Sequence, residues 1–174
     1  MRPAFVRVGG IAALLVPVIL WGGGAVVIVV LSSDAVPAKV GRVYEEVLGA
    51  ASPLLMAVAM AATWRPMVEA GCRKTALLLI ALIAALILCV GLYAALGNLA
   101  IFSDEIGTRP LQAAGAFAYA AAFALAFAFG ASIAGGAGTG QGLWRAAGVL
   151  YIIAGLMAAP SWAVLGAQLV EAGE

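Results

Sequence analysis

The chain has 174 residues, of which 66% are hydrophobic and 10% are charged. Soluble domains carry about 25% charged residues, so this composition excludes an ordinary water-soluble protein. The net charge of +1 excludes the broad basic face that nucleic acid requires. The lack of histidine removes the commonest ligand of haem and transition metals. We therefore expect an all-α integral membrane protein.

Five apolar stretches are each close to the length of about 20 residues that a helix needs to cross a bilayer. They cover residues 8–31, 47–64, 75–96, 111–134 and 146–170. Backbone polar groups must be satisfied internally in lipid, and no ten-residue alternation typical of a β-barrel is present, so helices are predicted. The sequence thus predicts a single multi-pass membrane domain over residues 1–174, a bundle of about five transmembrane helices.

The first stretch also resembles a signal peptide, because a basic start and an apolar run precede the small residues at 32–35. Cleavage there would leave four transmembrane helices. The apolar run is about twice as long as the usual 7–15 residues, which favours an uncleaved helix. Pro17 and the glycines at 22–24 are expected to weaken this helix and bend it.

A short amphipathic helix is predicted at about 35–47, on the outer surface and running into the second span. Its apolar stripe consists of Val36, Val40, Val43 and Tyr44, with most charged residues on other faces. The stripe could contact a partner protein or lie among lipid headgroups. Pro53 is expected to bend the chain farther on.

The fourth span carries two rows of small residues, each spaced by four. One row is Ala116, Ala120, Ala124 and Ala128, and the other is Ala118, Ala122, Ala126 and Gly130. Membrane helices approach closely where small residues line the contact, so both rows are predicted to pack against helices of the bundle or of a partner. An aromatic row between them (Tyr119, Phe123 and Phe127) favours packing or lipid contact over a quinone.

Basic residues predict a cytoplasmic N-terminus under the positive-inside rule. The predicted inner segments hold Arg2, Arg7, Arg65, Arg73, Lys74 and Arg145, against Lys39, Arg42 and Arg109 in the outer segments. Five spans would then place the C-terminus outside. The richness in alanine and glycine is typical of a GC-rich bacterial genome, so the bacterial inner membrane is the expected location.

The predicted spans contain no charged residue, which disfavours pumps, proton-coupled carriers and voltage sensors. Without histidine no Ser/His/Asp or Cys/His set can form, and no metal-ligand cluster is recognisable. Cys72 and Cys89 would lie roughly 25 Å apart on one helix, too far for a disulfide. No cofactor is predicted, although a lipid, quinone or pigment held by apolar contacts alone would leave no motif.

The leading functional prediction is a non-catalytic membrane subunit that anchors, scaffolds or assembles a larger inner-membrane complex, with membrane lipid and other subunits as partners. The alternative is a homo-oligomeric channel or carrier for a small neutral or lipid-like solute. A weaker alternative is a membrane enzyme acting on lipid. The polar residues that such an enzyme could use near the membrane faces are Glu45, Glu46, Asn98, Asp104, Glu105, Arg109 and Gln112.

Overall fold

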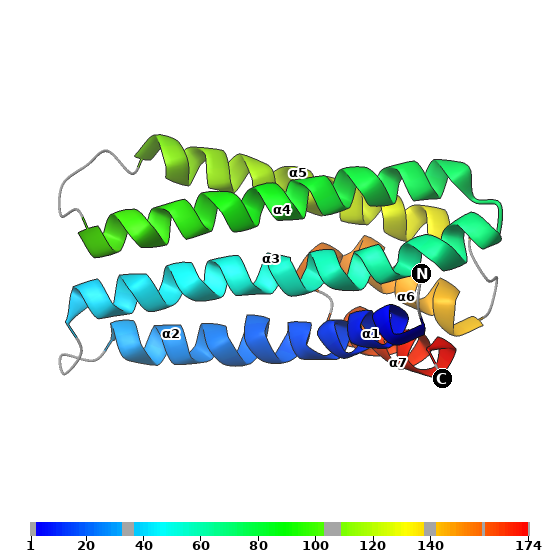
Figure 1. Cartoon of the computed structure of the whole chain (residues 1–174), viewed down its shortest axis with the longest axis horizontal. Helices are drawn as coiled ribbons and strands as arrows, with labels where there is room; N and C mark the ends of the chain where they lie inside the picture. The colour runs from blue at the N-terminus through cyan, green and yellow to red at the C-terminus, as the bar shows by residue number, and fades with distance from the viewer. Residues whose placement is uncertain (1–2, 33–36, 103–108, 138–141, 158, 174) are drawn as a thin grey trace.

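The predicted all-α membrane bundle is confirmed by the computed structural model, which describes residues 3–32, 37–102, 109–137, 142–157 and 159–173. Every regular element in these ranges is helical (Figure 1). Four described stretches are long and apolar enough to cross a membrane: Ala4–Val26, Val47–Glu69, Arg73–Leu96 and Ala113–Ala134.

The first span is one continuous rod made of three helical segments. The α-helix α1 covers Pro3–Pro17, a π-helix η1 covers Val18–Gly23, and the α-helix α2 covers Gly24–Leu31. Pro17 has no N–H to donate to the carbonyl one turn earlier, and a π-helix shifts the bonding by one residue. The π-helix therefore begins directly after Pro17 and ends within the glycine run at 22–24, the two places where the sequence is expected to weaken the helix.

The predicted amphipathic segment forms the first turns of α3 (Ala38–Glu69), so it runs directly into the second span. The helix continues through Pro53 without a break in its assignment. Its 32 residues correspond to about 48 Å at a rise of about 1.5 Å per residue. This length exceeds the bilayer core of about 30 Å, so the charged first turns extend beyond the apolar span.

The third and fourth spans are α4 (Arg73–Phe102) and α5 (Arg109–Ala134). The turn from α3 to α4 is a Schellman motif, in which the Cys72 N–H donates to the Met67 carbonyl at 3.0 Å and the Gly71 N–H donates to Val68 at 3.0 Å. Gly71 adopts φ 72°, a left-handed conformation that glycine takes without strain.

The predicted fifth span at 146–170 is wrong as a single spanning helix. It is a helical hairpin formed by α6 (Gly142–Ala154), a 3₁₀ turn η2 (Gly155–Met157) and α7 (Ala159–Ala172). The two α-helices have 13 and 14 residues, so each is about 20 Å long and neither crosses a core of about 30 Å.

Two residues break the expected span. Gly155 adopts φ 53°, which ends α6 in a left-handed turn. Pro160 cannot donate to the carbonyl of Leu156, and its ring would clash with that carbonyl in a continuous helix. The stranded carbonyl instead accepts a hydrogen bond from Trp162 Nε1 at 2.9 Å. The tip of the hairpin is thus closed by its own side chain.

Because the last helices fold back, the N- and C-termini lie at the same end of the bundle and not at opposite ends as five spans predicted (Figure 1). We call this the terminal end; it also holds the α3–α4 turn, the end of α5 and the start of α6. The opposite, distal end holds the end of α2, the start of α3, the end of α4 and the start of α5.

Around the terminal half, neighbouring helices form a closed ring in the order α1, α3, α4, α5, α6, α7 and back to α1. Two glycine pairs allow the hairpin to enter this ring. A Cβ added at Gly10 or at Gly166 would lie 2.8 Å from the carbonyl oxygen of the other, and the same distance applies to Gly130 and Gly148. Close backbone approach at small residues is typical of membrane helix contacts.

Aromatic side chains fill the interior between α5, α6 and α7. The Tyr151 ring meets Phe129 at 6.1 Å and Trp162 at 5.5 Å between centroids, both edge to face. All three side chains are fully buried. The hairpin is therefore an integral part of the core and not a surface addition.

Candidate functional site: a cavity in the distal half

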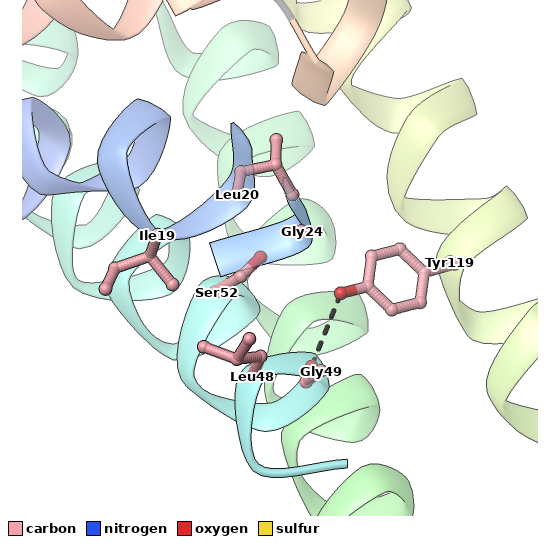
Figure 2. A pocket seen from close by; sticks show the side chains of 7 residues that line it. All are labelled: Ile19, Leu20, Gly24, Leu48, Gly49, Ser52 and Tyr119. Atoms are coloured by element: carbon pink, nitrogen blue, oxygen red, sulfur yellow. Dashed lines mark hydrogen bonds between the residues drawn. The ribbon is translucent and has the colours of Figure 1, made fainter. Parts of the chain in front are cut away.

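A cavity of about 190 Å³ lies in the distal half of the bundle, between the first span, α3 and α5 (Figure 2). We call it the distal cavity. Its walls are formed by Ile19, Leu20, Gly24, Leu48, Gly49, Ser52 and Tyr119. The π-helix supplies two of these residues, and α2 begins at the third.

The half-length of the hairpin explains why this space exists. The α6–α7 hairpin occupies only the terminal half, where it joins α5 to α1 (Figure 1). Its tip stops against the middle of α5: a Cβ added at Gly155 would lie 2.7 Å from Phe123 Cδ1 and 3.4 Å from Phe127 Cζ. Beyond the tip, over the described residues, the first span packs on α3 without extensive contact with α5.

The cavity contains a backbone carbonyl freed by a proline. Pro53 cannot donate the usual helical bond to the carbonyl of Gly49. The Tyr119 hydroxyl reaches across from α5 and donates to this carbonyl at a long distance of 3.4 Å (Figure 2). The hairpin tip has a similar arrangement, in which Trp162 donates to the Leu156 carbonyl that Pro160 leaves without its helical bond.

The second polar group of the cavity is the hydroxyl of Ser52. The side chain is 3% exposed, and its Oγ has no hydrogen-bond partner among the described residues. It borders the cavity from α3, and the Tyr119 hydroxyl approaches the same space from α5 (Figure 2). A buried hydroxyl without a partner costs free energy in an apolar environment, so this group is available to a ligand.

Tyr119 is held in place from its other side by Tyr93 of α4. The two rings are 5.5 Å apart and edge to face, with an interplanar angle of 82°. Gly49 provides space for Tyr93, because a Cβ at this position would lie 2.6 Å from Tyr93 Cδ1. The contact with Tyr93 of α4 therefore positions the Tyr119 ring, whose hydroxyl bonds to α3.

The three cavity walls all lie within apolar spans. Ser52 lies five residues from the distal end of its span, and Leu20 and Tyr119 each lie six residues from the distal ends of theirs. The first span continues beyond that end as the apolar helix α2, which reaches Leu31. At about 1.5 Å per residue the cavity is therefore at least roughly 8 Å inside the apolar stretches.

The two small-residue rows of α5 have opposite surroundings. The row Ala118, Ala122, Ala126 and Gly130 is buried inside the bundle, whereas the row Ala116, Ala120, Ala124 and Ala128 is exposed on its outside. Near the terminal end of the exposed row, the Ser132 hydroxyl shares a 2.6 Å hydrogen bond with Thr75 Oγ1 of α4.

The other predicted contact residues are placed only in part. Val40 is 54% exposed and Val43 is half-buried. Val36 and the side chain of Tyr44 lie outside the described residues. Of the aromatic row of α5, Tyr119 lines the cavity, and Phe123 lies against the hairpin tip. Phe127 also contacts the tip but is 40% exposed.

The polar residues considered for a lipid-modifying enzyme are not described at side-chain level in the structure. Among the described residues, no group of three or more His, Cys, Asp or Glu side chains could hold a metal ion. Cys72 and Cys89 form no disulfide, as their predicted separation requires.

Sequence reasoning missed the distal cavity, because most of its lining residues are ordinary for a membrane helix. One signal was present. Pro53 lies four residues after Gly49, and this spacing strands the Gly49 carbonyl. Which side chain reaches that carbonyl depends on a helix 70 residues away in sequence.

No protein-family model, no curated protein and no solved structure matches this chain.

Proposed function

We propose that the chain is a non-catalytic integral membrane subunit that anchors, scaffolds or assembles a larger complex in a bacterial inner membrane. The observation that carries this proposal is the exposed alanine row on α5 (Ala116, Ala120, Ala124 and Ala128). Much of the exposed apolar surface elsewhere carries large side chains, such as Ile28 at 69%, Leu77 at 65% and Ile153 at 71% exposure, and α4 exposes Ala81 and Ala84 between such side chains.

The contrast matters because lipid tails can contact any apolar side chain, whereas small residues specifically permit a second helix to approach closely. The exposed row follows one side of α5 over most of the span. Phe117, 77% exposed, lies beside its distal end and offers a large side chain for the contact. We therefore assign the row to a transmembrane helix of another subunit.

The described interior supports a non-catalytic role. Its buried polar residues are Ser52, Thr63, Thr75 and Ser161, all hydroxyl side chains without charge. Pumps and ion-coupled carriers use ionisable residues inside the membrane. A subunit that only binds other subunits does not need such residues.

In this proposal the terminal end faces the cytoplasm. Six of the nine basic residues belong to sequence segments at this end, which fits the positive-inside rule. Both termini are then cytoplasmic. A maleimide that cannot cross membranes should label Cys72, in the α3–α4 turn, in inverted vesicles; labelling in intact spheroplasts would contradict the orientation.

The subunit proposal is tested by mild-detergent extraction from the native membrane, followed by sizing and mass spectrometry. We expect a larger protein to co-purify in fixed stoichiometry. The double variant Ala120→Leu with Ala124→Leu should lose this partner, because leucine prevents the close approach. Elution of the wild-type chain alone would overturn the proposal.

The matched control is Ala81→Leu with Ala84→Leu on α4, where both alanines are also exposed. It adds the same volume to a different outer face and should retain the partner. If both double variants lose the partner equally, the loss reflects damage to the bundle and the α5 assignment fails.

The distal cavity favours one alternative, a homo-oligomeric channel or carrier for a small neutral or lipid-like solute. The cavity lies against a π-helix and beside a half-length hairpin, features that interrupt regular helices in the membrane. In liposomes, flux of a neutral solute such as glycerol would support it if Gly23→Leu abolished the flux. A Cβ added at Gly23 would lie 3.1 Å from Leu48 of the cavity wall, so a leucine side chain there would press on this wall.

A further inference from the structure

We propose that the distal cavity binds one lipid-soluble molecule through a carbonyl oxygen, which accepts a hydrogen bond from the hydroxyl of Ser52. This inference goes beyond the proposed subunit function and does not depend on it. A lipid in this cavity would be held whether the chain works with other subunits or alone.

The polar atoms define the chemistry of the ligand. Ser52 Oγ is buried without a hydrogen-bond partner among the described residues, whereas the Tyr119 hydroxyl proton is donated to the Gly49 carbonyl at 3.4 Å. The Ser52 hydroxyl can donate, and it borders the cavity (Figure 2). A ligand acceptor beside Ser52 would complete its hydrogen bonding.

The depth of the cavity defines the source of that carbonyl. Ser52 lies about 8 Å inside its apolar span. Polar headgroups and bulk water do not occupy this level. The acceptor must therefore belong to a molecule that is itself soluble in the bilayer.

The volume limits the part of the ligand that enters. A cavity of about 150 Å³ is known to accommodate benzene, so about 190 Å³ holds one ring or a short stretch of one chain. The two side-chain hydroxyls and one carbonyl of the cavity are enough partners for one buried water. The remaining lining is apolar and offers no partners for further waters. The rest of the ligand would extend into the bilayer.

The walls allow entry from the membrane. Ile19, Leu20 and Leu48 are half-buried, so the cavity is not sealed from the lipid side. Gly24 is also half-buried, and a Cβ added there would meet nothing within 4 Å. Two molecules share the required chemistry, an acyl-chain ester of a membrane lipid and an isoprenoid quinone.

The test measures ligand retained by purified protein. Native mass spectrometry after washing in mild detergent should show one molecule per wild-type chain. Solvent extraction of the same sample distinguishes a phospholipid from a quinone. Delipidated protein is then titrated with a short-chain phosphatidylcholine in one arm and decyl-benzoquinone in the other, and binding is expected in one arm.

The blocking variant is Gly24→Leu, which places a side chain into open space at the cavity wall and should abolish retention. Its matched control is Gly22→Leu in the same span, because a Cβ at Gly22 would also have no neighbour within 4 Å and Gly22 does not line the cavity. The control should bind like wild type. Equal retention by both variants, or no ligand on wild-type protein in either arm, would overturn the proposal.

The hydroxyl variant tests the carbonyl assignment and does not depend on the glycine variants. The change Ser52→Ala removes the donor and keeps the cavity walls. Binding of the effective probe should weaken roughly two- to twelvefold, which is the contribution of one hydrogen bond. Undiminished binding by this variant would overturn recognition of a carbonyl.

Discussion

Replacing Gly148 with alanine should force α6 away from α5. The added Cβ would lie 2.6 Å from the backbone N of Ala134, 2.7 Å from Ile133 Cγ1 and 2.8 Å from the carbonyl oxygen of Gly130. Two of these three atoms belong to the backbone of α5, so no side-chain rotation can relieve the overlap. The helices must separate by several tenths of an ångström, and the dispersion contacts along the interface weaken.

The magnitude follows from comparison with Gly91→Ala in α4. A Cβ at Gly91 meets nothing within 4 Å, so this variant gains only the helix propensity of alanine, about 0.8–1 kcal/mol. Gly148→Ala gains the same propensity but also overpacks a close contact, which costs about 1–3 kcal/mol. The free energies of unfolding of the two variants should therefore differ by about 1–3 kcal/mol, or roughly 5- to 150-fold in the equilibrium constant.

The assay is SDS-induced unfolding in mixed micelles, followed by tryptophan fluorescence. Trp144 and Trp162 are both buried in the hairpin and report its separation from the bundle. Gly148→Ala should unfold at lower SDS than wild type, and Gly91→Ala at the same or higher SDS. If Gly148→Ala is as stable as Gly91→Ala, the close crossing of α5 and α6 is not present in the folded protein.

The same SDS titration checks two further variants, and thiol labelling checks one more feature. In delipidated protein, Ser52→Ala should not lower stability, because its Oγ is buried without a partner; a clear loss would reveal a hydrogen bond to this group. Trp162→Phe should destabilise by about 0.5–1.5 kcal/mol or more, since it removes the 2.9 Å bond to the Leu156 carbonyl, and an unchanged midpoint would contradict closure of the hairpin tip by this bond. In folded protein a maleimide should modify half-buried Cys72 much faster than Cys89, which is 0% exposed, and equal rates would place Cys89 at the surface.

The membrane class and the four long helices follow from the sequence alone. A run of apolar residues without charge must be in lipid and must satisfy its own backbone, so length and composition suffice to predict a helix. The breaks at Pro17 and the glycine run were also readable, because the missing N–H of proline is a local property. No tertiary information is needed for such local rules.

The hairpin could not be predicted in this way. Pro160 also weakens the expected fifth span, but proline is tolerated in many membrane helices when neighbours satisfy the freed groups. The outcome depended on Gly155 taking a left-handed conformation and on Trp162 reaching the Leu156 carbonyl. The Trp162 ring is also packed against Tyr151, which in turn contacts Phe129 of α5. The reversal then moved the C-terminus to the terminal end.

The tertiary structure likewise decided which small-residue row of α5 is buried in the bundle and which is exposed on its outside. The spacing by four shows that Ala118 and Ala120 belong to different rows, but two similar rows look equivalent in sequence. Packing against α4 and α6 buries one row and leaves the other exposed. The distal cavity arises for the same reason: a hairpin of half the membrane's length fills one half of the ring and leaves space between the first span and Tyr119 in the other.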